Sequence, residues 1–174
     1  DYNPIHHIES RLKTTESIEE KLMRLDKEIS IASAKENLFD IAGIRVVCNF
    51  IDDVYAVADM LTSQSDVRLL TEKDYIKNPK TNGYRSLHLI VEIPVFLSEG
   101  RILVPVEVQI RTIAMDFWAS LEHSLRYKAQ EYIPQHISDE LQRVATDIAS
   151  LDQRMQAIHD QVDELSDARS DNAT

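Results

Sequence analysis

Glycine, proline and cysteine are scarce in this chain: its 174 residues include three glycines, five prolines and one cysteine. So few glycines and prolines exclude a chain built of flexible linkers or low-complexity repeats. With 43% hydrophobic residues the chain can bury a core of ordinary size. The single cysteine, Cys48, cannot form an internal disulfide and lies in an apolar run. It indicates a small buried side chain in a reducing, cytoplasmic location.

Long hydrophobic runs and an excess of basic charge are missing as well. No stretch of about 18 apolar residues occurs, so we expect no membrane span, and we expect no secretory leader. The net charge is -11, and residues 131–174 hold ten acidic and three basic side chains. This acidity argues against an anionic membrane or nucleic acid as the main partner. Basic clusters in residues 1–130 leave RNA open as a ligand.

An alternating segment, residues 104–112, is the clearest strand in the sequence. Its apolar side chains point one way and its polar side chains the other: Val104, Val106, Val108 and Ile110 against Glu107, Gln109 and Arg111. A helix is expected to follow over residues 113–128. Two interpretations stay open for the polar side. It is either the solvated face of a one-sided sheet, which this strand alone favours, or a site where a rigidly held Glu107 binds a metal ion or acts as a base.

A second carboxylate, Asp40, precedes another strand, expected over residues 44–50 because of its β-branched content. Asp40 is either a turn or cap residue or a ligand for a hard cation, since Mg²⁺ binds one or two carboxylates together with substrate phosphates. Gly43, at the entrance of the strand, suggests a close backbone approach or an unusual dihedral angle.

Four basic residues cluster near the start of the chain: Arg11, Lys13, Lys21 and Arg24. The last two lie three residues apart on one face of an expected helix. Thr14, Thr15 or Ser17 can cap this helix, and Ser17 has the capping-box spacing to Glu20. The cluster is either a solvated helix face paired with nearby glutamates or a cradle for a polyphosphate. Phosphate oxygens take charge-assisted hydrogen bonds from lysine and arginine.

Residues 73–86 form a basic loop with three lysines and two tyrosines, marked by Asn-Pro and Asn-Gly pairs. It leads into a strand expected over residues 87–93, and Tyr84, Ser86 and His88 should share one face there. The loop is either a plain connection or a nucleotide site, where an aromatic ring stacks on a base and lysines meet phosphate.

A turn at residues 98–101 makes the 87–93 strand the antiparallel neighbour of the 104–112 strand. His88 and Glu107 should therefore fall in one sheet.

The remaining residues are expected to be helical. Phe117, Leu121 and Leu125 form an apolar stripe that we assign to the core. From Ile137 to Leu165 apolar residues follow at spacings of four and three, a sustained heptad that packs on its own domain or builds an oligomer. The chain thus divides into a catalytic or binding domain, residues 1–130, and a helical extension, residues 131–174, expected to mediate oligomerisation.

Four ordered segments resemble the synthetase signature of the RelA/SpoT homologues: Asp40–Arg45, Lys73–Ile76, Asn82–His88 and Val106–Thr112. The short length and the helix at residues 118–123 look like the stand-alone small alarmone synthetases, RelP-like or RelQ-like, and residues 93–97 lean towards the RelP-like group. The resemblance covers about residues 5–165. It implies an α+β fold with a mixed β-sheet flanked by helices, similar to the nucleotidyltransferases, and a long C-terminal helix.

The activity that this resemblance implies is that of a GTP/GDP pyrophosphokinase. Such enzymes move the β,γ-pyrophosphate of ATP to the 3′-hydroxyl of GDP or GTP and make ppGpp or pppGpp, the alarmones of the stringent response. Synthesis without hydrolysis and a homotetramer are expected. A catalytically weak guanine-nucleotide sensor, or an RNA-binding regulator on the same fold, remains the alternative.

The resemblance also implies a role for each candidate residue. Arg11 and Arg45 would stack on either side of adenine, while the ATP phosphates would be held by Lys13, Lys21 and Arg24. Asp40 would bind Mg²⁺, with Glu107 as a second ligand or as the base for the 3′-hydroxyl. Tyr84 would stack on guanine, and the acceptor nucleotide would be placed by Lys80, His88 and Gln109.

Overall fold

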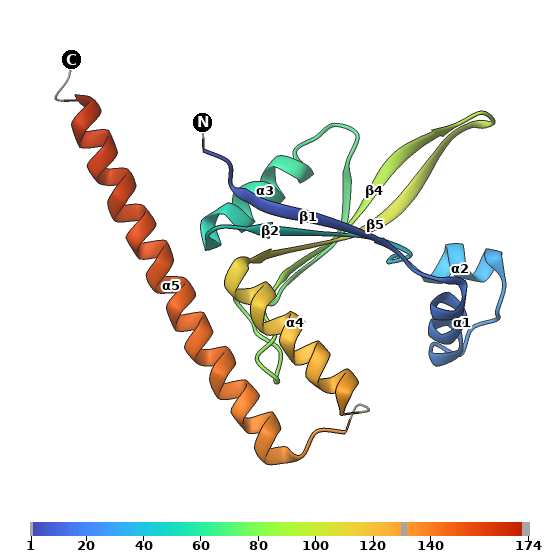
Figure 1. Cartoon of the computed structure of the whole chain (residues 1–174). Coiled ribbons are helices and arrows are strands. Elements are labelled where there is room, and N and C mark those ends of the chain that lie inside the picture. Colours follow the sequence, from blue (N-terminus) through green and yellow to red (C-terminus); the bar gives the residue numbers. More distant parts are fainter. Residues whose placement is uncertain (1, 130–131, 172–174) are drawn as a thin grey trace.

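The structure, a computed structural model, describes residues 2–129 and 132–171. Its elements are, in chain order, β1 (Ile5–Leu12), α1 (Thr15–Arg24), α2 (Ile31–Asn37), β2 (Ala42–Cys48), α3 (Ile51–Thr62), β3 (Arg68–Asp74), β4 (Leu87–Leu97), β5 (Gly100–Thr112), α4 (Ile113–Lys128) and α5 (Gln135–Asp171) (Figure 1). The strands form one sheet in the order β1-β2-β5-β4-β3, with β2 and β5 parallel and the other neighbours antiparallel. The expected mixed sheet with flanking helices and a long C-terminal helix is confirmed.

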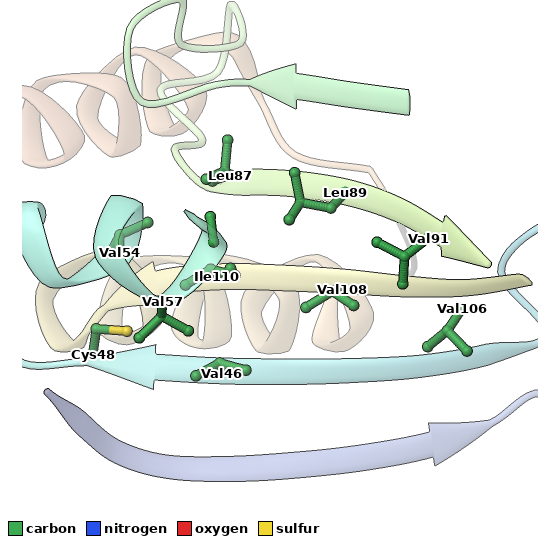
Figure 2. Packing of buried hydrophobic residues seen from close by; sticks show 11 residues of the cluster. Val46, Cys48, Val54, Val57, Leu87, Leu89, Val91, Val106, Val108 and Ile110 are labelled. Carbon is green, nitrogen blue, oxygen red and sulfur yellow. The ribbon is translucent and has the colours of Figure 1, made fainter. Parts of the chain in front are cut away.

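One face of the sheet carries the main core, which Figure 2 shows from close by. The central strand β5 buries Val106, Val108 and Ile110 there, and α3 covers them with Val54 and Val57. Each fully buried side chain of this size stabilises the fold by about 1.5–3 kcal/mol. This burial fixes the strand register, because a slip of one residue would turn the polar side chains of β5 into the core.

The opposite face carries the candidate site residues in two rows that cross the strands. The first row, from β1 to β3, contains Glu9, Arg45, Gln109, His88 and Lys73. The second row contains Arg11, Gly43, Glu107, Ile90 and Thr71. Strand register therefore brings together residues from distant parts of the sequence.

The backbone conformation and surroundings of Gly43 differ from those expected from the sequence. Its φ angle lies outside the left-handed region, and a Cβ atom added there would lie 3.8 Å from the nearest atom, the carbonyl oxygen of Arg11. Neither a close backbone approach nor a left-handed conformation is found. Because Gly43 has no side chain, the surface of the sheet between Arg11 and Glu107 is left uncovered.

The N-terminal segment contains a strand that hydrophobic periodicity did not predict. Residues 5–12, which have no clear period, form the edge strand β1, and most of its side chains are exposed on both faces. An edge strand with little burial carries no alternation signal. The cap of α1 is Thr14, whose hydroxyl accepts from the backbone nitrogen of Ser17 at 3.3 Å, so Ser17 is not the cap residue.

The apolar stripe on α4 is not part of the core, and that expectation was wrong. Phe117, Leu121 and Leu125 are 57%, 50% and 46% exposed. The helix instead buries the neighbouring face that contains Met115 and Trp118. Periodicity shows that a helix has an apolar stripe, but it does not show what covers that stripe.

The long helix α5 has two different faces. Its inner face packs Leu141, Ala145 and Ile148 against Trp118 of α4. Its outer apolar residues are about half exposed or more: Leu151, Met155, Ile158, Val162 and Leu165. No helix within the described parts of the chain is both long enough and apolar enough to cross a bilayer.

Candidate active site

Asp40 lies just before β2 and is held by two lysines from the N-terminal cluster. Its Oδ2 atom accepts hydrogen bonds from the ammonium groups of Lys13, at 3.0 Å, and Lys21. The three side chains are 16%, 14% and 24% exposed, respectively. The structure thus joins a carboxylate and two cations that lie up to 27 residues apart in sequence.

The charge state of Asp40 follows from these neighbours. Burial raises the pKa of its carboxyl group, but the hydrogen bonds and positive charges of Lys21 and Lys13 outweigh burial, so the pKa lies below its ordinary value. Asp40 is therefore an anion at neutral pH. Its other oxygen, Oδ1, is buried and makes no hydrogen bond within the described residues. An ionised carboxylate with one unpartnered buried oxygen fits a divalent metal ion.

Glu107 begins a line of hydrogen-bonded polar side chains along β5. Gln109 donates from Nε2 to Oε2 of Glu107 at 3.2 Å and accepts at Oε1 from Nη2 of Arg111 at 3.0 Å. Glu107 is 22% exposed and Arg111 5% exposed. Gln109, on the same strand, therefore fixes the rotamer of Glu107 through Oε2. The Oε1 atom of Glu107 stays available to groups outside β5.

His88, on the adjacent strand β4, connects Glu107 with Tyr84. Its Nδ1 atom lies 3.7 Å from Oε1 of Glu107, and its Nε2 atom lies 2.8 Å from the hydroxyl of Tyr84. That hydroxyl also accepts a hydrogen bond from Nη2 of Arg111 at 2.7 Å. The hydroxyl of Tyr84 therefore joins the guanidinium group of Arg111 to the imidazole ring of His88.

The pKa of His88 agrees with this arrangement. Burial, followed by the positive charges of Arg111, Lys80, Lys73 and Arg45, lowers the pKa of His88 to about 4. The ring is neutral at pH 7, so its approach to Glu107 is not an ion pair. A neutral ring has one nitrogen that donates and one that accepts, and these two nitrogens face Tyr84 and Glu107.

The loop before β4 carries an aromatic and cationic cluster. The ammonium group of Lys80 lies 4.8 Å from the ring centre of Tyr75 and 4.9 Å from that of Tyr84. Tyr75 packs edge-on against His88 with ring centres 5.2 Å apart. One ring face of Tyr84 is therefore covered by a lysine, which must move before a base can stack on that face.

Two cavities meet at Glu107. The first, of about 290 Å³, lies over β1, β2 and β5 and is lined by Arg11, Gly43, Arg45, Glu107 and Gln109 among others. The second, of about 310 Å³, is lined by Lys21, Asp40, Lys73, Tyr75, His88 and Glu107 among others. Glu107 therefore forms the boundary between a cavity with two arginines and a cavity with the Asp40 carboxylate.

Most of the expected site residues line these two cavities, but Tyr84 lines neither and instead lines another cavity, of about 430 Å³, with Arg11, Arg45 and Arg111. Gln109, expected beside the acceptor, lines the cavity of Arg11 and Arg45. Arg24 is exposed at the end of α1, one helical turn beyond Lys21. Its place at the ATP phosphates stays a prediction.

Arg111 is the main site residue that sequence reasoning missed. Besides Gln109 and Tyr84, it binds Oδ1 of Asp116 at 3.0 Å through Nη1. Its position four residues after Glu107 on the polar side of β5 was the available signal. The alternation of side chains along the strand could not show that this arginine is buried and contacts three other side chains.

Comparison with known proteins identifies the family. Residues 10–132 match the model of the region found in RelA/SpoT proteins. The chain belongs to the RelA/SpoT family. The expected family is thus confirmed, and the four motifs that carried the resemblance lie on or next to the polar face of the sheet.

Relatives of this RelA/SpoT-family chain span most of its length. It is 50% identical over 162 residues to GTP pyrophosphokinase YwaC from Bacillus subtilis, covering 93% of this chain and 77% of that protein. The crystal structure of small alarmone synthetase 1 from Bacillus subtilis bound to its product pppGpp superposes with a TM-score of 0.85 at 40% identity, covering 93% and 82% of the two chains. The structure of the same enzyme bound to AMPCPP gives 0.78 at 37% identity, covering 94% and 82%.

RelA/SpoT-family proteins generally use a divalent metal ion. Within the described residues, no group of three or more histidine, cysteine, aspartate and glutamate side chains gathers to hold a metal. A site of one or two carboxylates completed by substrate phosphates needs no such group. Asp40 and Glu107 are the carboxylates that line the second cavity.

Proposed function

We propose that this protein is a GTP/GDP pyrophosphokinase, which transfers the β,γ-pyrophosphate of ATP to the 3′-hydroxyl of GDP or GTP and releases AMP. The observation that carries this proposal is the position of Glu107 between the two cavities. One cavity offers arginines to a nucleotide base, and the other offers cations, a carboxylate and aromatic rings. A group transfer between two nucleotides needs one carboxylate at the junction of their sites.

The donor nucleotide fits the side of the sheet formed by β1, β2 and α1. Arg11 and Arg45 line the first cavity from adjacent strands, which suits two guanidinium groups stacked on adenine. Lys13 and Lys21 meet at Asp40, so phosphates bound next to Asp40 would contact the same ammonium groups. The bond between the β-phosphorus of ATP and the oxygen that bridges it to the α-phosphorus would then break. That oxygen stays on AMP, which is the leaving group.

The acceptor fits the loop side of the site, next to the second cavity, where Tyr84 contacts His88. Tyr84 supplies a ring for guanine once Lys80 moves from its face, and that ammonium group is then free to meet acceptor phosphate. Neutral His88 supplies a hydrogen-bonding group between Tyr84 and Glu107. These contacts would hold the 3′-hydroxyl near Glu107.

Glu107 would receive the proton of the 3′-hydroxyl as the new bond from that oxygen to the β-phosphorus forms. Asp40, with Glu107 as the second carboxylate of the site, would hold Mg²⁺, which neutralises charge on the transferred phosphates when it is bound. Lys13 and Lys21 add positive charge at the same place. Alignment and charge neutralisation supply most of the rate in phosphoryl-type transfers.

The deciding experiment follows product formation directly. The protein is incubated with Mg²⁺, ATP labelled at the γ-phosphate, and GDP or GTP, and the products are separated by chromatography. We expect labelled ppGpp from GDP or pppGpp from GTP, with one AMP for each, and no transfer in the presence of EDTA. Nucleotide binding without transfer would contradict the proposal and favour a guanine-nucleotide sensor. A salt-dependent gel shift with single-stranded RNA would favour an RNA-binding regulator.

We also propose that the protein acts as a cytoplasmic homotetramer, with residues 131–174 contributing to assembly. A cavity of about 530 Å³ lies between α4 and α5 and is lined by Ile113, Phe117, Leu151 and Met155 among others. These side chains are 44–57% exposed in the single chain. Apolar surface of this extent on two adjoining helices fits a second copy of the chain. The boundary at residues 130–131 lies outside the described residues.

Replacing Phe117 by Asp should reduce the molecular mass in solution. A charge placed in an apolar interface cannot be solvated there, and it weakens association. Size-exclusion chromatography with light scattering measures the mass of the wild type and of the variant. Phe96→Asp is the matched control, because Phe96 is 77% exposed on the distant end of β4. A tetramer that persists in Phe117→Asp would rule out this surface.

A further inference from the structure

The inner face of α5 contacts the back of the acceptor loop, which we define as residues 75–86 between β3 and β4. The loop is closed by backbone hydrogen bonds, including one from Tyr75 to the carbonyl of Ser86 at 3.0 Å and one from Lys80 to the carbonyl of Tyr84 at 3.1 Å. Tyr84 contacts His88, which lines the second cavity, and Lys80 lies over the ring of Tyr84. The opposite side of the loop lies against α5, so this helix is part of the loop's surroundings.

Gly83 makes the closest of these contacts. A Cβ atom added at Gly83 would lie 2.4 Å from the Cβ atom of Ala145 on α5, and the φ angle of Gly83 is +93°. Only a glycine next to a small residue allows this approach. Trp118 closes the contact from α4 and donates from Nε1 to the carbonyl of Leu141 at 3.0 Å. Tyr84 packs against this cluster with its ring.

A buried carboxylate makes the second contact. Asp152 of α5 accepts a hydrogen bond from the hydroxyl of Thr112 at 2.7 Å and lies 3.6 Å from Nη1 of Arg85. The side chains of Asp152 and Arg85 are 4% and 10% exposed. Nη1 of Arg85 makes no hydrogen bond in the described part of the chain, so Asp152 is the negative charge that compensates it. Thr112 and Arg85 are the direct neighbours of Arg111 and Tyr84.

These contacts connect the carboxylate of Asp152 to the chain neighbours of two residues that share a hydrogen bond in the site. Arg111 donates to the hydroxyl of Tyr84, and Asp152 binds the residue after Arg111 and the residue after Tyr84. Removing one member of a buried ion pair leaves the other charge uncompensated, which strongly destabilises its surroundings. Arg85, the charge that would be left unpaired without Asp152, lies in the loop that carries Tyr84.

We propose that Asp152 of α5 is a positioning residue for the acceptor nucleotide, which it serves through Arg85 and Thr112. This rests on the proposed pyrophosphokinase function. Asp152 lines neither cavity at Glu107, so it acts only through Arg85 of the loop and Thr112 of β5. Residues of the C-terminal helix therefore determine acceptor affinity in addition to any part in assembly.

Asp152→Asn tests this role, because asparagine keeps the shape and an oxygen for Thr112 but removes the charge opposite Arg85. Initial rates are measured with GDP or GTP varied at saturating ATP, and with ATP varied at saturating acceptor. We expect the KM for the acceptor to rise about ten-fold or more, because small misplacements of binding groups are costly. The KM for ATP and the kcat at saturating acceptor should stay within about two-fold of the wild type. Asp147→Asn, an exposed carboxylate on the same helix, is the control and should change nothing.

A variant with both charges removed separates positioning from stability. In Arg85→Met with Asp152→Leu, apolar packing restores the free energy of unfolding that one unpaired charge would cost. Because leucine at this position accepts no hydrogen bond from Thr112, and the pair no longer connects Arg85 to α5, the acceptor KM should remain raised. This double variant also provides the comparison if Asp152→Asn does not fold. A wild-type acceptor KM in the stable double variant, or equal loss for both substrates in step with the loss of folded protein, would overturn the positioning role. Absence of transfer in the wild type would instead reject the proposed function itself.

Discussion

Glu107→Gln is expected to lower the rate of pyrophosphate transfer by about 10²–10⁴-fold, the usual contribution of a positioned general base. Glutamine has the shape of glutamate but cannot take the proton of the acceptor hydroxyl at neutral pH. The central position of β5 and the hydrogen bond from Gln109 hold the side chain in either form. Single-turnover measurement of AMP release, with bound substrates in excess over their dissociation constants, isolates the chemical step.

The fold should be unaffected by this change, because Glu107 lies on the polar face and not among the core residues of β5. Glu99→Gln is the matched control, since Glu99 is an exposed carboxylate in the turn that joins β4 and β5. Circular dichroism should show equal thermal unfolding for the wild type and both variants. A transfer rate for Glu107→Gln within a few-fold of the wild type would remove Glu107 from the chemistry.

The second large effect is expected from Asp40→Asn, which should reduce transfer by roughly 10³-fold. A metal ion contributes several kcal/mol of charge stabilisation in the transition state, and about 4 kcal/mol corresponds to three powers of ten. Asparagine is a weaker ligand and carries no charge to balance Lys13 and Lys21. The variant should also need a higher Mg²⁺ concentration for half-maximal rate. Titration of the transfer rate with Mg²⁺ measures both changes.

Asp26→Asn provides the control for Asp40→Asn. Asp26 is an exposed carboxylate just after α1 with a φ of 54°, a conformation that asparagine also adopts readily. Its substitution removes the same charge near the same helix, but away from the cavity. Equal Mg²⁺ titration curves for Asp40→Asn and the wild type would show that Asp40 holds no metal, even if the rate fell.

The parts of the fold that the sequence predicted correctly are those with a strong local pattern. Strand β5 has strict alternation, and the turn before it indicated the antiparallel pairing that places His88 beside Glu107. Helix α5 has a heptad over most of its length. Such patterns predict the element correctly because each element buries one face, whichever elements lie next to it.

The errors lie where burial depends on distant neighbours. Edge strand β1 has no buried face that alternates, and the α4 stripe at Phe117 is exposed because Trp118 and its neighbours pack inward instead. The alternation of β5 placed Arg111 on the polar side but could not show its role, since its partners come from β5, α4 and the acceptor loop.

By itself, the sequence determined the family and the reaction class, because the motifs that carry them are short and contiguous, and it named the candidate site residues. Tertiary structure alone decided which of those residues meet. Strand register put Glu107 between two cavities, and the return of α5 set Asp152 beside Arg85. Both depend on contacts between residues far apart in the chain, and the free energy of such contacts comes from burial that no local segment can provide.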